Sequence, residues 1–526
     1  MIFLILLLGR PLEIESSLSN GCLEMFCEKH SEYKKRKKVA TQNFITKYKT
    51  FMNYKWKILF IANASDSKTR KEGERLFNIL ASSNFHKEVA VLVAYNTKQG
   101  PGPIPTLTQT IVYEFEVNES TGKRKPKIVG EPFIGDFGDE KTLIKILRKI
   151  NESYAAERDI LFTWDHGVGF GIFSMDPNEH FSQDGVDWLN EGNHDSNPPP
   201  NPPRFEVISS NDEDLKFNQI WLADPGATMS TEENFHTDME FREFVATRKN
   251  LSMLTNDELA KAIAYGYPKG KVDIIIMMNC WMMLADTIYS LKEATSVLIA
   301  SQSTQWWAGY DYKGIINLIC NDQETTGDII GKISRYVLES VRSNYIQNKY
   351  GQYIRELSFL AVDLRDKKDV TDFYKNFLSL ADKLKEQIKQ SFQAIKKQRE
   401  NCFDFSDDPT KKREPLWHYI DLLNFFDKLY SISLIGKEDI LSLKKDFKKL
   451  YLDDFRGQNY NSKNEQTDIF KANGISIYFP PDFEEKEGDD FWKFFYENGK
   501  HQSLLAKEKE WKLFLDWYYE ADRVPQ

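Results

Sequence analysis

Two short apolar segments, each leading to a reactive side chain, constrain the fold of this chain more than any other feature. The segment Ile160-Leu-Phe-Thr-Trp-Asp leads to His166, and the segment Val272-Asp-Ile-Ile-Ile-Met-Met-Asn leads to Cys280. Apolar runs of this length, rich in β-branched residues, are typical of buried parallel strands. Reactive groups in an open α/β sheet gather beyond the carboxyl ends of the strands, so two neighbouring strands would hold the imidazole beside the thiol. This arrangement predicts a cysteine nucleophile assisted by a histidine.

Length, charge and cysteine content exclude several classes of protein. The 526 residues predict two to four domains or one enlarged domain, and 41% hydrophobic residues suffice for a large core. The formal net charge of −9, with charges of both signs mixed, argues against a nucleic-acid-binding protein. No stretch reaches the roughly 18 apolar residues of a transmembrane helix. Five cysteines, an odd and low number, argue against a disulfide scaffold, and no Cys/His spacing indicates a zinc or other metal site.

Residues 1–54 are expected to be an N-terminal extension, and three interpretations of them stay open. Met1-Ile-Phe-Leu-Ile-Leu-Leu-Leu has the apolar character of a secretion signal, and a signal in residues 1–17 would make the protein secreted or attached to the cell envelope. The segment lacks a basic start and a small-residue cleavage site, so it also fits a short membrane-proximal segment. Alternatively, the chain starts at Met52, just before the first convincing strand, and the protein is cytoplasmic.

Strand and helix patterns alternate between residues 55 and 320, which predicts an α/β core with a mostly parallel sheet flanked by helices. The strands are marked by apolar runs and the helices by 3.6-residue spacing. We expect strands at 56–62, 88–94, 110–117, 126–129, 160–165, 272–280 and 296–300, and helices at 69–80, 139–150, 254–263 and 283–292.

Residues 174–250 interrupt this alternation and are expected to be an exposed insertion between the strand of His166 and the strand of Cys280. The insertion includes the stiff proline-rich segment 197–204. We expect limited proteolysis and any self-processing to cut first within residues 174–250. Residues 321–526 are expected to form a mainly helical C-terminal region, because Lys, Glu and Leu dominate, with a late strand at 474–479 that returns to the fold.

The order and spacing of these segments resemble the clostripain-like cysteine peptidase family, in the caspase-like clan that also holds gingipains, legumain and separase. The resemblance covers nearly the whole chain after residue 55. The matching segments are 56–62, Gly135–Asp139 with Thr142-Leu143, the strand ending in His166-Gly167, 254–263, the strand ending in Cys280, Tyr289–Lys292, Leu298–Gln302, Gly309–Tyr312, Tyr419–Phe425 and Gly474–Pro480.

The resemblance implies a caspase-like fold and a hydrolase, a protease that cleaves peptide or protein substrates with His166 and Cys280 as a catalytic dyad. Because Gly167 has no Cβ, a substrate carbonyl can approach its backbone closely, and its N–H is an oxyanion donor together with that of Cys280. No cofactor is predicted. Calcium is possible by family resemblance, but no motif supports it, and the acidic runs Asp212-Glu-Asp214 and Glu484-Glu485 are more typical of solvated loops.

Two positions depart from the family pattern, and both concern substrate binding. The family usually has Asp two residues before the cysteine, at the base of the pocket that selects Arg or Lys, and commonly Glu after the Ala-Ser of the next strand. Here these positions are Met278 and Gln302. An Arg buried without a carboxylate partner costs on the order of several kcal/mol. We therefore expect a primary specificity that is not strictly for Arg or Lys.

An alternative function stays open, because the missing acid at Met278 also fits a catalytically inactive paralogue that binds peptides or proteins through the same cleft. Asp165 would point away from His166 on an alternating strand, so a surface position is expected for it. The remaining candidates are interpreted as structural: His180, His194 and His236 as solvated loop residues, and Trp306-Trp307 as either pocket wall or core.

Overall fold

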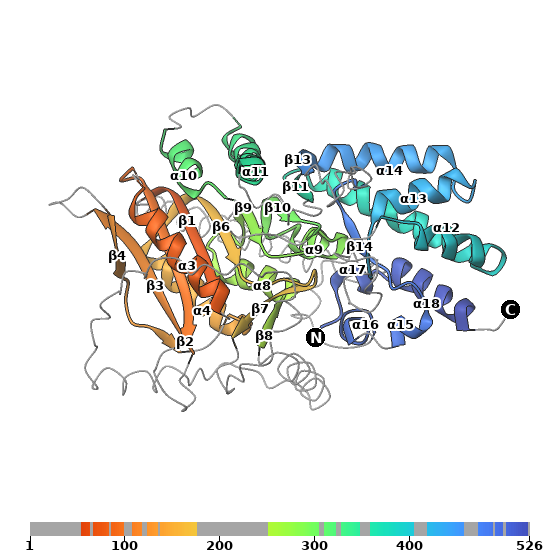
Figure 1. The fold of residues 1–526 in the computed structure, drawn as a ribbon, viewed down its shortest axis with the longest axis horizontal. Helices are drawn as coiled ribbons and strands as arrows, with labels where there is room; N and C mark the ends of the chain where they lie inside the picture. Colours follow the sequence, from red (N-terminus) through yellow and green to blue (C-terminus); the bar gives the residue numbers. More distant parts are fainter. Residues whose placement is uncertain are drawn as a thin grey trace, which may run out of the picture. The chain divides into compact units, whose positions relative to one another are not determined.

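The two apolar segments lie side by side in the middle of a ten-stranded sheet (Figure 1). The computed structural model describes residues 54–523 other than 64–66, 84–85, 99–107, 118–123, 135–136, 176–250, 304–309, 322–327, 348–357, 404–417, 457–471, 488–489 and 498–500. The export-signal segment, the proline-rich insertion with its three histidines and its acidic run Asp212–Asp214, and the Trp306-Trp307 pair lie outside the described residues.

The sheet has parallel strands in its centre and antiparallel strands at both edges, in the order β13-β11-β10-β9-β6-β1-β2-β3-β4, with β5 paired to β3. The five central strands are β10 (Thr295–Ser301), β9 (Val272–Met278), β6 (Ala156–Trp164), β1 (Tyr54–Asn63) and β2 (Val89–Lys98). The edge strands are β3 (Thr108–Val117), β4 (Arg124–Ile128), β5 (Phe133–Ile134), β11 (Ser358–Asp363) and β13 (Tyr451–Arg456). The predicted α/β sheet is confirmed.

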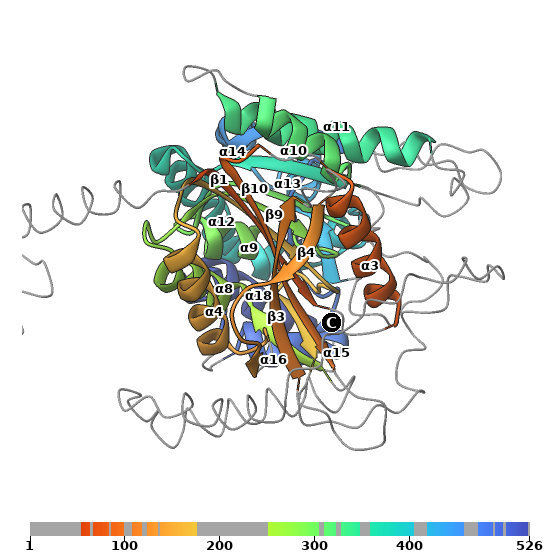
Figure 2. The same cartoon turned by 90° about the vertical axis from the view of Figure 1, so that its left-hand side faces the viewer.

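Helices cover both faces of this sheet (Figures 1 and 2). On one face, Ile58 and Phe60 of β1 share an apolar cluster with α3 (Ser67–Ala81), α10 (Tyr312–Asn321) and α11 (Ile329–Gln347). On the other face, Leu59 and Ile61 share a second cluster with α4 (Glu140–Ser153), α8 (Asn256–Gly266) and α9 (Ala285–Leu291). Successive side chains of a strand point to opposite faces of the sheet. A continuous apolar run therefore contributes side chains to the apolar clusters on both faces.

Side-chain caps define the first residues of two helices in the second layer. Asp139 precedes α4, and its carboxylate accepts a hydrogen bond from the backbone N–H of Thr142 at 2.8 Å. Thr255 caps α8 in a reciprocal arrangement with Glu258. These caps fix the helix ends that lie near the carboxyl edge of the sheet.

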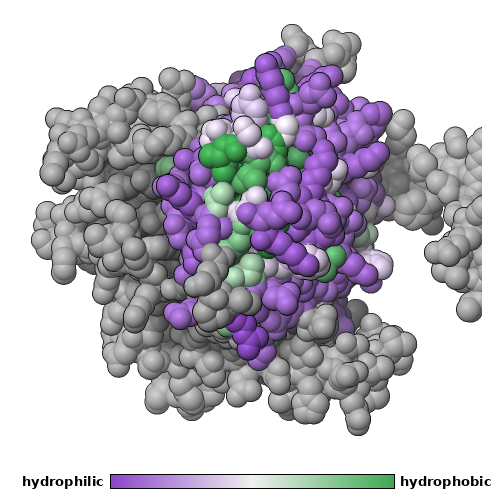
Figure 3. Space-filling view, turned by 90° about the vertical axis from the view of Figure 1, so that its right-hand side faces the viewer, coloured by the Kyte–Doolittle hydropathy of each residue, from purple (hydrophilic) through white to green (hydrophobic). Residues whose placement is uncertain are grey.

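The C-terminal region is mainly helical, as predicted, and it shares the apolar cluster of the second layer. Its helices are α12 (Lys367–Glu400), α13 (Leu422–Ser431), α14 (Lys437–Leu450), α15 (Phe483–Glu487), α16 (Asp490–Phe495), α17 (Leu504–Lys507) and α18 (Glu510–Arg523). A small antiparallel pair, β12 (Tyr419–Asp421) and β14 (Ser476–Tyr478), lies among them. Figure 3 shows the outer side of this region as largely hydrophilic around one apolar patch.

Several strands differ from the sequence-based expectation. Residues 321–526 were expected to be mainly helical with one late strand, yet β11 and β13 also lie in this region and extend the main sheet. Both are short and pair antiparallel, and β13 forms the edge of the sheet, where no long apolar run is needed. The two ends of the insertion also pair, as β7 (Gly171–Met175) with β8 (Leu251–Thr255). Within the described residues, no helix has the length and apolarity needed to cross a membrane.

A buried carboxylate joins α9 to the C-terminal region. Asp286 lies in the first turn of α9 and is 1% exposed. The hydroxyl of Ser503 donates a hydrogen bond to it at 2.7 Å, and the hydroxyl of Tyr496 lies 3.2 Å from its second oxygen. Burial raises the pKa of Asp286 from 3.8 to about 6, although the hydrogen bonds from Ser503 and Tyr496 oppose this rise. Between these two pKa values the folded protein therefore holds a proton on Asp286 that the unfolded chain has released.

This carboxyl should stabilise the fold as the pH falls. Between pH 7.5 and pH 5 the folded state takes up the Asp286 proton, while the unfolded chain, with a pKa near 3.8, takes up little. The stability of the wild type should therefore rise by about 1 kcal/mol relative to Asp286→Asn, which cannot titrate. Urea unfolding of both proteins at the two pH values measures this difference. An unchanged difference between the proteins would contradict the assignment.

Candidate active site

His166 and Cys280 lie at matched positions beyond two paired strands. β6 and β9 are parallel neighbours whose register ends with Trp164 opposite Met278. Each candidate residue follows its strand by two positions, and paired strands are about 4.8 Å apart. Cys280 is 9% exposed, whereas His166 is partly exposed. The structure therefore places the two residues just beyond the ends of neighbouring parallel strands.

Gly167 explains how closely the two strand ends approach. A Cβ at this residue would lie 2.7 Å from the carbonyl oxygen of Cys280 and 2.7 Å from the Cβ of Asn279. Real side chains do not tolerate such distances, so only glycine allows this contact. The backbone of Gly167 therefore lies directly against the backbone of the candidate nucleophile.

Asp165 is fully buried, so the expected surface position is wrong. Its Oδ1 accepts a hydrogen bond from the backbone N–H of His166 at 2.7 Å. The alternation argument failed because β6 ends at Trp164, so the strand period no longer applies one residue later. Asp165 therefore fixes the backbone of His166.

Three side chains from other elements hold the loop that follows His166. The carbonyl of Gly169 accepts hydrogen bonds from the amide of Asn256 and from the hydroxyl of Thr287, each at 2.8 Å. The hydroxyl of Tyr419 donates to the carbonyl of Val168 at 2.5 Å. Sequence analysis did not identify Asn256, Thr287 or Tyr419, although two of them lie in or next to segments that carry the family resemblance.

An aromatic contact attaches the same loop to the C-terminal region. The ring of Phe170 stacks on that of Phe495, with centroids 4.5 Å apart and an interplanar angle of 10°. Tyr478 and Tyr496 meet the same ring edge-on, at 5.3 and 6.0 Å. The histidine loop is therefore packed between the sheet and the C-terminal region.

The turn after Cys280 has a strained backbone. Trp281 has a φ of +57°, a left-handed conformation that bulky side chains rarely adopt. Its N–H donates to the carbonyl of Ser303 at 3.1 Å, and the N–H of Met283 donates to the carbonyl of Ser301 at 2.8 Å. These bonds attach the turn to the end of β10. Such strain persists only where the surroundings enforce it, and it concentrates at functional sites.

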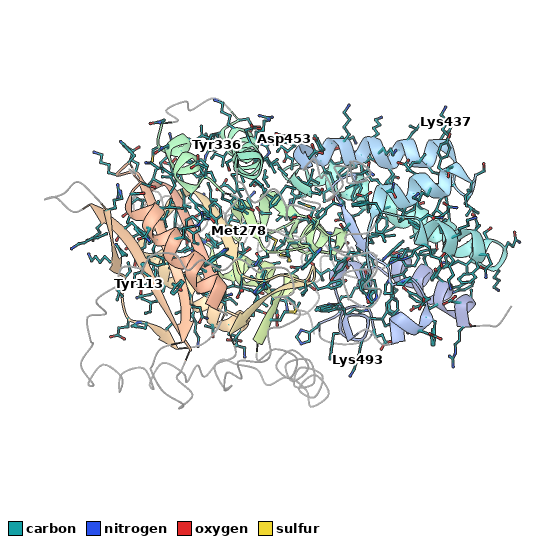
Figure 4. The ribbon with its side chains drawn as sticks, in the orientation of Figure 1. Tyr113, Met278, Tyr336, Lys437, Asp453 and Lys493 are labelled. Carbon is teal, nitrogen blue, oxygen red and sulfur yellow. The ribbon has the colours of Figure 1, made fainter. Side chains whose placement is uncertain are left out.

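Met278 lies on the face of the sheet covered by α10, among the central strands (Figure 4). It is 1% exposed, and the hydroxyl of Tyr312 lies 3.3 Å from its sulfur. Asp311, the acid next to Tyr312, accepts hydrogen bonds from the N–H of Gly314 and the hydroxyl of Tyr336, both at 2.9 Å. The surroundings of Met278 are therefore apolar, and the carboxylate of Asp311 already accepts two hydrogen bonds.

Gln302 lies apart from Met278, against the C-terminal pair β12–β14. Its amide nitrogen donates to Asp421 at 3.2 Å and to Ser476 at 3.1 Å, and its oxygen accepts from Ser358 at 2.7 Å. The residue is fully buried. The structure thus brings the backbones of His166, Gly167 and Cys280 to the ends of two neighbouring strands. Met278 packs in the apolar cluster on the α10 face of the sheet, whereas Cys280 belongs to the cluster on the other face. Gln302 joins β10 to the C-terminal region.

Other candidate sites are distinct from this one. Among the described residues, no group of three His, Cys, Asp or Glu side chains is arranged to hold a metal ion. A cavity of about 600 Å³ lies between α4, α8, α9 and α17, with Asp257, Lys261, Lys292 and His501 in its lining. None of the five predicted site residues lines it.

Comparisons with known proteins agree with the sequence pattern. The model of the clostripain family matches residues 236–518, just over half of the chain, a range that includes Cys280 and begins after His166. The chain is similar to a secreted C11 cysteine protease from Bacteroides thetaiotaomicron solved with an irreversible peptide inhibitor, at 14% identity and a TM-score of 0.49, over 89% of this chain and 99% of that one. It is also similar to an inactive zymogen C11 protease from Parabacteroides distasonis, at 12% identity and a TM-score of 0.47, over 89% and 98%. No curated protein matches the sequence.

The contact at Gly167 gives a direct test of this geometry. Gly167→Ala should lower the free energy of unfolding by about 1–3 kcal/mol, because the added methyl group displaces the Asn279–Cys280 backbone. The same displacement should change the rate at which iodoacetamide alkylates Cys280. Gly130→Ala is the control for adding a methyl group. A Cβ there meets no other atom within 4 Å, so its only cost comes from the positive φ of the backbone. A Gly167→Ala protein with wild-type stability and alkylation rate would contradict this packing.

Proposed function

The chain belongs to the clostripain family, and on that premise we propose that it is a cysteine endopeptidase with Cys280 as nucleophile and His166 as its proton-transfer partner. The observation that carries this proposal is the matched position of the two residues beyond the paired strands β6 and β9. Peptide-bond cleavage requires a nucleophile for the carbonyl carbon and an acid for the leaving amine. A thiolate supplies the first and a protonated imidazole the second.

The reaction proceeds in two steps. The Cys280 thiolate attacks the peptide carbonyl, and protonated His166 donates its proton to the leaving amine as the C–N bond breaks. Water then attacks the thioester, gives a proton to His166 and releases the acid and the thiolate. We assign the N–H groups of Gly167 and Cys280 to the negative oxygen of each tetrahedral intermediate, since their backbones lie against each other.

The mechanism needs two side chains and no cofactor. Asp165 is the acid nearest to His166 in sequence, and its Oδ1 binds the backbone N–H of that residue. We therefore assign Asp165 to holding the histidine backbone rather than to accepting a proton from the ring. Since the imidazole acts first as an acid, no third residue is required to make it more basic.

The substrate is a peptide or protein, and its primary specificity is proposed to be for uncharged side chains. Met278 offers a polarizable thioether in apolar surroundings, and a guanidinium there would lose its hydration. Asp311, the acid next to Tyr312, already accepts hydrogen bonds from Gly314 and Tyr336. The apolar surroundings of Met278 support the expectation that strict Arg or Lys specificity is absent.

Replacement of either dyad residue tests the reaction. Cys280→Ala and His166→Ala should each lower the rate of peptide cleavage by at least about a thousandfold, because the two residues act as a unit. Cys402→Ala is the matched control, since Cys402 is 8% exposed against 9% for Cys280 but lies in the C-terminal region. Cleavage is measured with a peptide library on proteins whose folding has been checked by circular dichroism.

The same experiment separates the enzyme from a binding protein. An inactive paralogue would bind peptides equally well with and without the Cys280 thiol and would not react with an electrophilic peptide probe. Wild-type cleavage rates in Cys280→Ala would refute the dyad.

Matched substrates test the specificity. Two peptides that differ only in the residue before the scissile bond, Arg in one and Leu or Met in the other, should give a kcat/KM at least as high for the uncharged side chain. The reason is the apolar environment of Met278. A kcat/KM for Arg that is tenfold higher, about 1.4 kcal/mol of preference, would show that another acid binds the basic side chain.

A further inference from the structure

We propose that Asn279 is a positioning residue that sets the place of His166 relative to Cys280. This inference rests on the proposed dyad and deepens it. Asn279 directly precedes Cys280, and its side chain contacts the chain on both sides of His166. One amide therefore links the two reactive residues.

The hydrogen bonds of Asn279 cross from the end of β9 to the end of β6. Its amide nitrogen donates to the carbonyl of Asp165 at 2.8 Å, and its oxygen accepts from the hydroxyl of Thr163 at 2.6 Å. All three residues are fully buried. Hydrogen bonds shielded from water are strong and costly to break, so this link resists displacement.

These bonds continue the strand pairing after the backbone ladder has ended. The register of β6 and β9 runs to Trp164 opposite Met278, and neither strand continues beyond that pair. Beyond that pair, the side chain of Asn279 links the two chains instead. Like a backbone peptide group, its amide can both donate and accept a hydrogen bond. An apolar residue of similar size would fill the space but make neither bond.

The packing of Asn279 also holds the chain on the other side of His166. Its Cβ lies 2.7 Å from the place that a Cβ of Gly167 would occupy, so the two residues are in direct contact. Asn279 thus binds Asp165 before the histidine and packs on Gly167 after it. Cys280 is the next residue in the chain, so any shift of Asn279 also moves the thiol. The same shift breaks the contacts that hold the backbone on both sides of His166.

Catalysis is more sensitive to such a shift than folding is. A misplacement of about 1 Å lowers a reaction rate by about a hundredfold. Binding of the substrate depends on a much larger surface and should change less. The expected signature is a loss in kcat without a comparable change in KM.

The test compares Asn279→Ala with the buried but remote Asn151→Ala. Asn151 makes two similar amide hydrogen bonds, to Leu147 at 2.8 Å and Gly266 at 3.0 Å, and it accepts one from Lys57. We expect Asn279→Ala to lower kcat by about 10- to 100-fold with KM changed less than about threefold. Asn151→Ala should lower the melting temperature and leave kcat of the folded protein unchanged.

A second readout measures the dyad without turnover. The rate of Cys280 alkylation by iodoacetamide, followed against pH, reports how strongly the imidazole of His166 favours the thiolate. In Asn279→Ala the midpoint of this profile should move toward that of His166→Ala. Thr163→Val, which removes only one of the two hydrogen bonds, should move it in the same direction by a smaller amount and serves as the test if Asn279→Ala does not fold.

The outcomes separate this inference from the proposed function. If the wild type neither cleaves peptides nor shows alkylation that depends on His166, the dyad itself is wrong and the inference falls with it. If the wild type does both, and Asn279→Ala or Thr163→Val keeps the wild-type kcat and alkylation profile, the positioning role is overturned and the dyad stands.

Discussion

The parallel pairing of β6 with β9 is the interaction on which the rest of the site depends. Its register places the residues two positions past each strand at the same edge of the sheet, which is where His166 and Cys280 stand. A slip by one residue would turn the side chains of one strand onto the wrong face, and a slip by two would displace them by roughly 6.6 Å. Apolar layers on both faces oppose either slip, because each strand is buried from both sides. The apolar core therefore fixes the register that sets the relative positions of His166 and Cys280.

The C-terminal region supports the part of the site that the sheet cannot hold. The loop after His166 leaves the sheet, and Tyr419 of the C-terminal region binds its carbonyl at Val168, while Asn256 and Thr287 of the α/β core bind its carbonyl at Gly169. The stack of Phe170 on Phe495 adds an apolar contact from the same direction. Two buried polar clusters, one at Asp286 and one at Gln302, join this region to α9 and β10. The region after residue 418 is therefore part of the scaffold of the site.

The central strands could be predicted because burial on both faces leaves a continuous local signal in the sequence. β1, β2, β6, β9 and β10 all follow apolar runs in the sequence. β13 could not be predicted in the same way, since its sequence Tyr451-Leu-Asp-Asp-Phe-Arg456 has no apolar run. β11 does carry a short apolar run at residues 359–362, but this run lies between two segments with helical patterns, so it was not predicted as a strand.

The side chains that hold the site were beyond sequence reasoning for a different reason. Tyr419 and Val168 are 251 residues apart, and Asn256 and Gly169 are 87 apart, so no local pattern records their hydrogen bonds. Asp165 was predicted to lie at the surface because the strand was expected to continue through it. The strand ends one residue earlier, at Trp164, and such an end is harder to predict than the strand itself. Gln302 was linked to substrate binding by analogy, whereas its contacts with Asp421, Ser476 and Ser358 depend on the tertiary fold.

A crystal structure of the protein trapped with a peptidyl electrophile tests the central claim most directly. The account predicts a covalent bond to the sulfur of Cys280, with the imidazole of His166 within hydrogen-bond reach of the leaving-group position, directly or through one water molecule. It also predicts that the N–H groups of Gly167 and Cys280 face the carbonyl oxygen of the adduct. An adduct on another cysteine, or an imidazole turned away from Cys280 in the adduct, would contradict the claim that β6 and β9 align a catalytic pair.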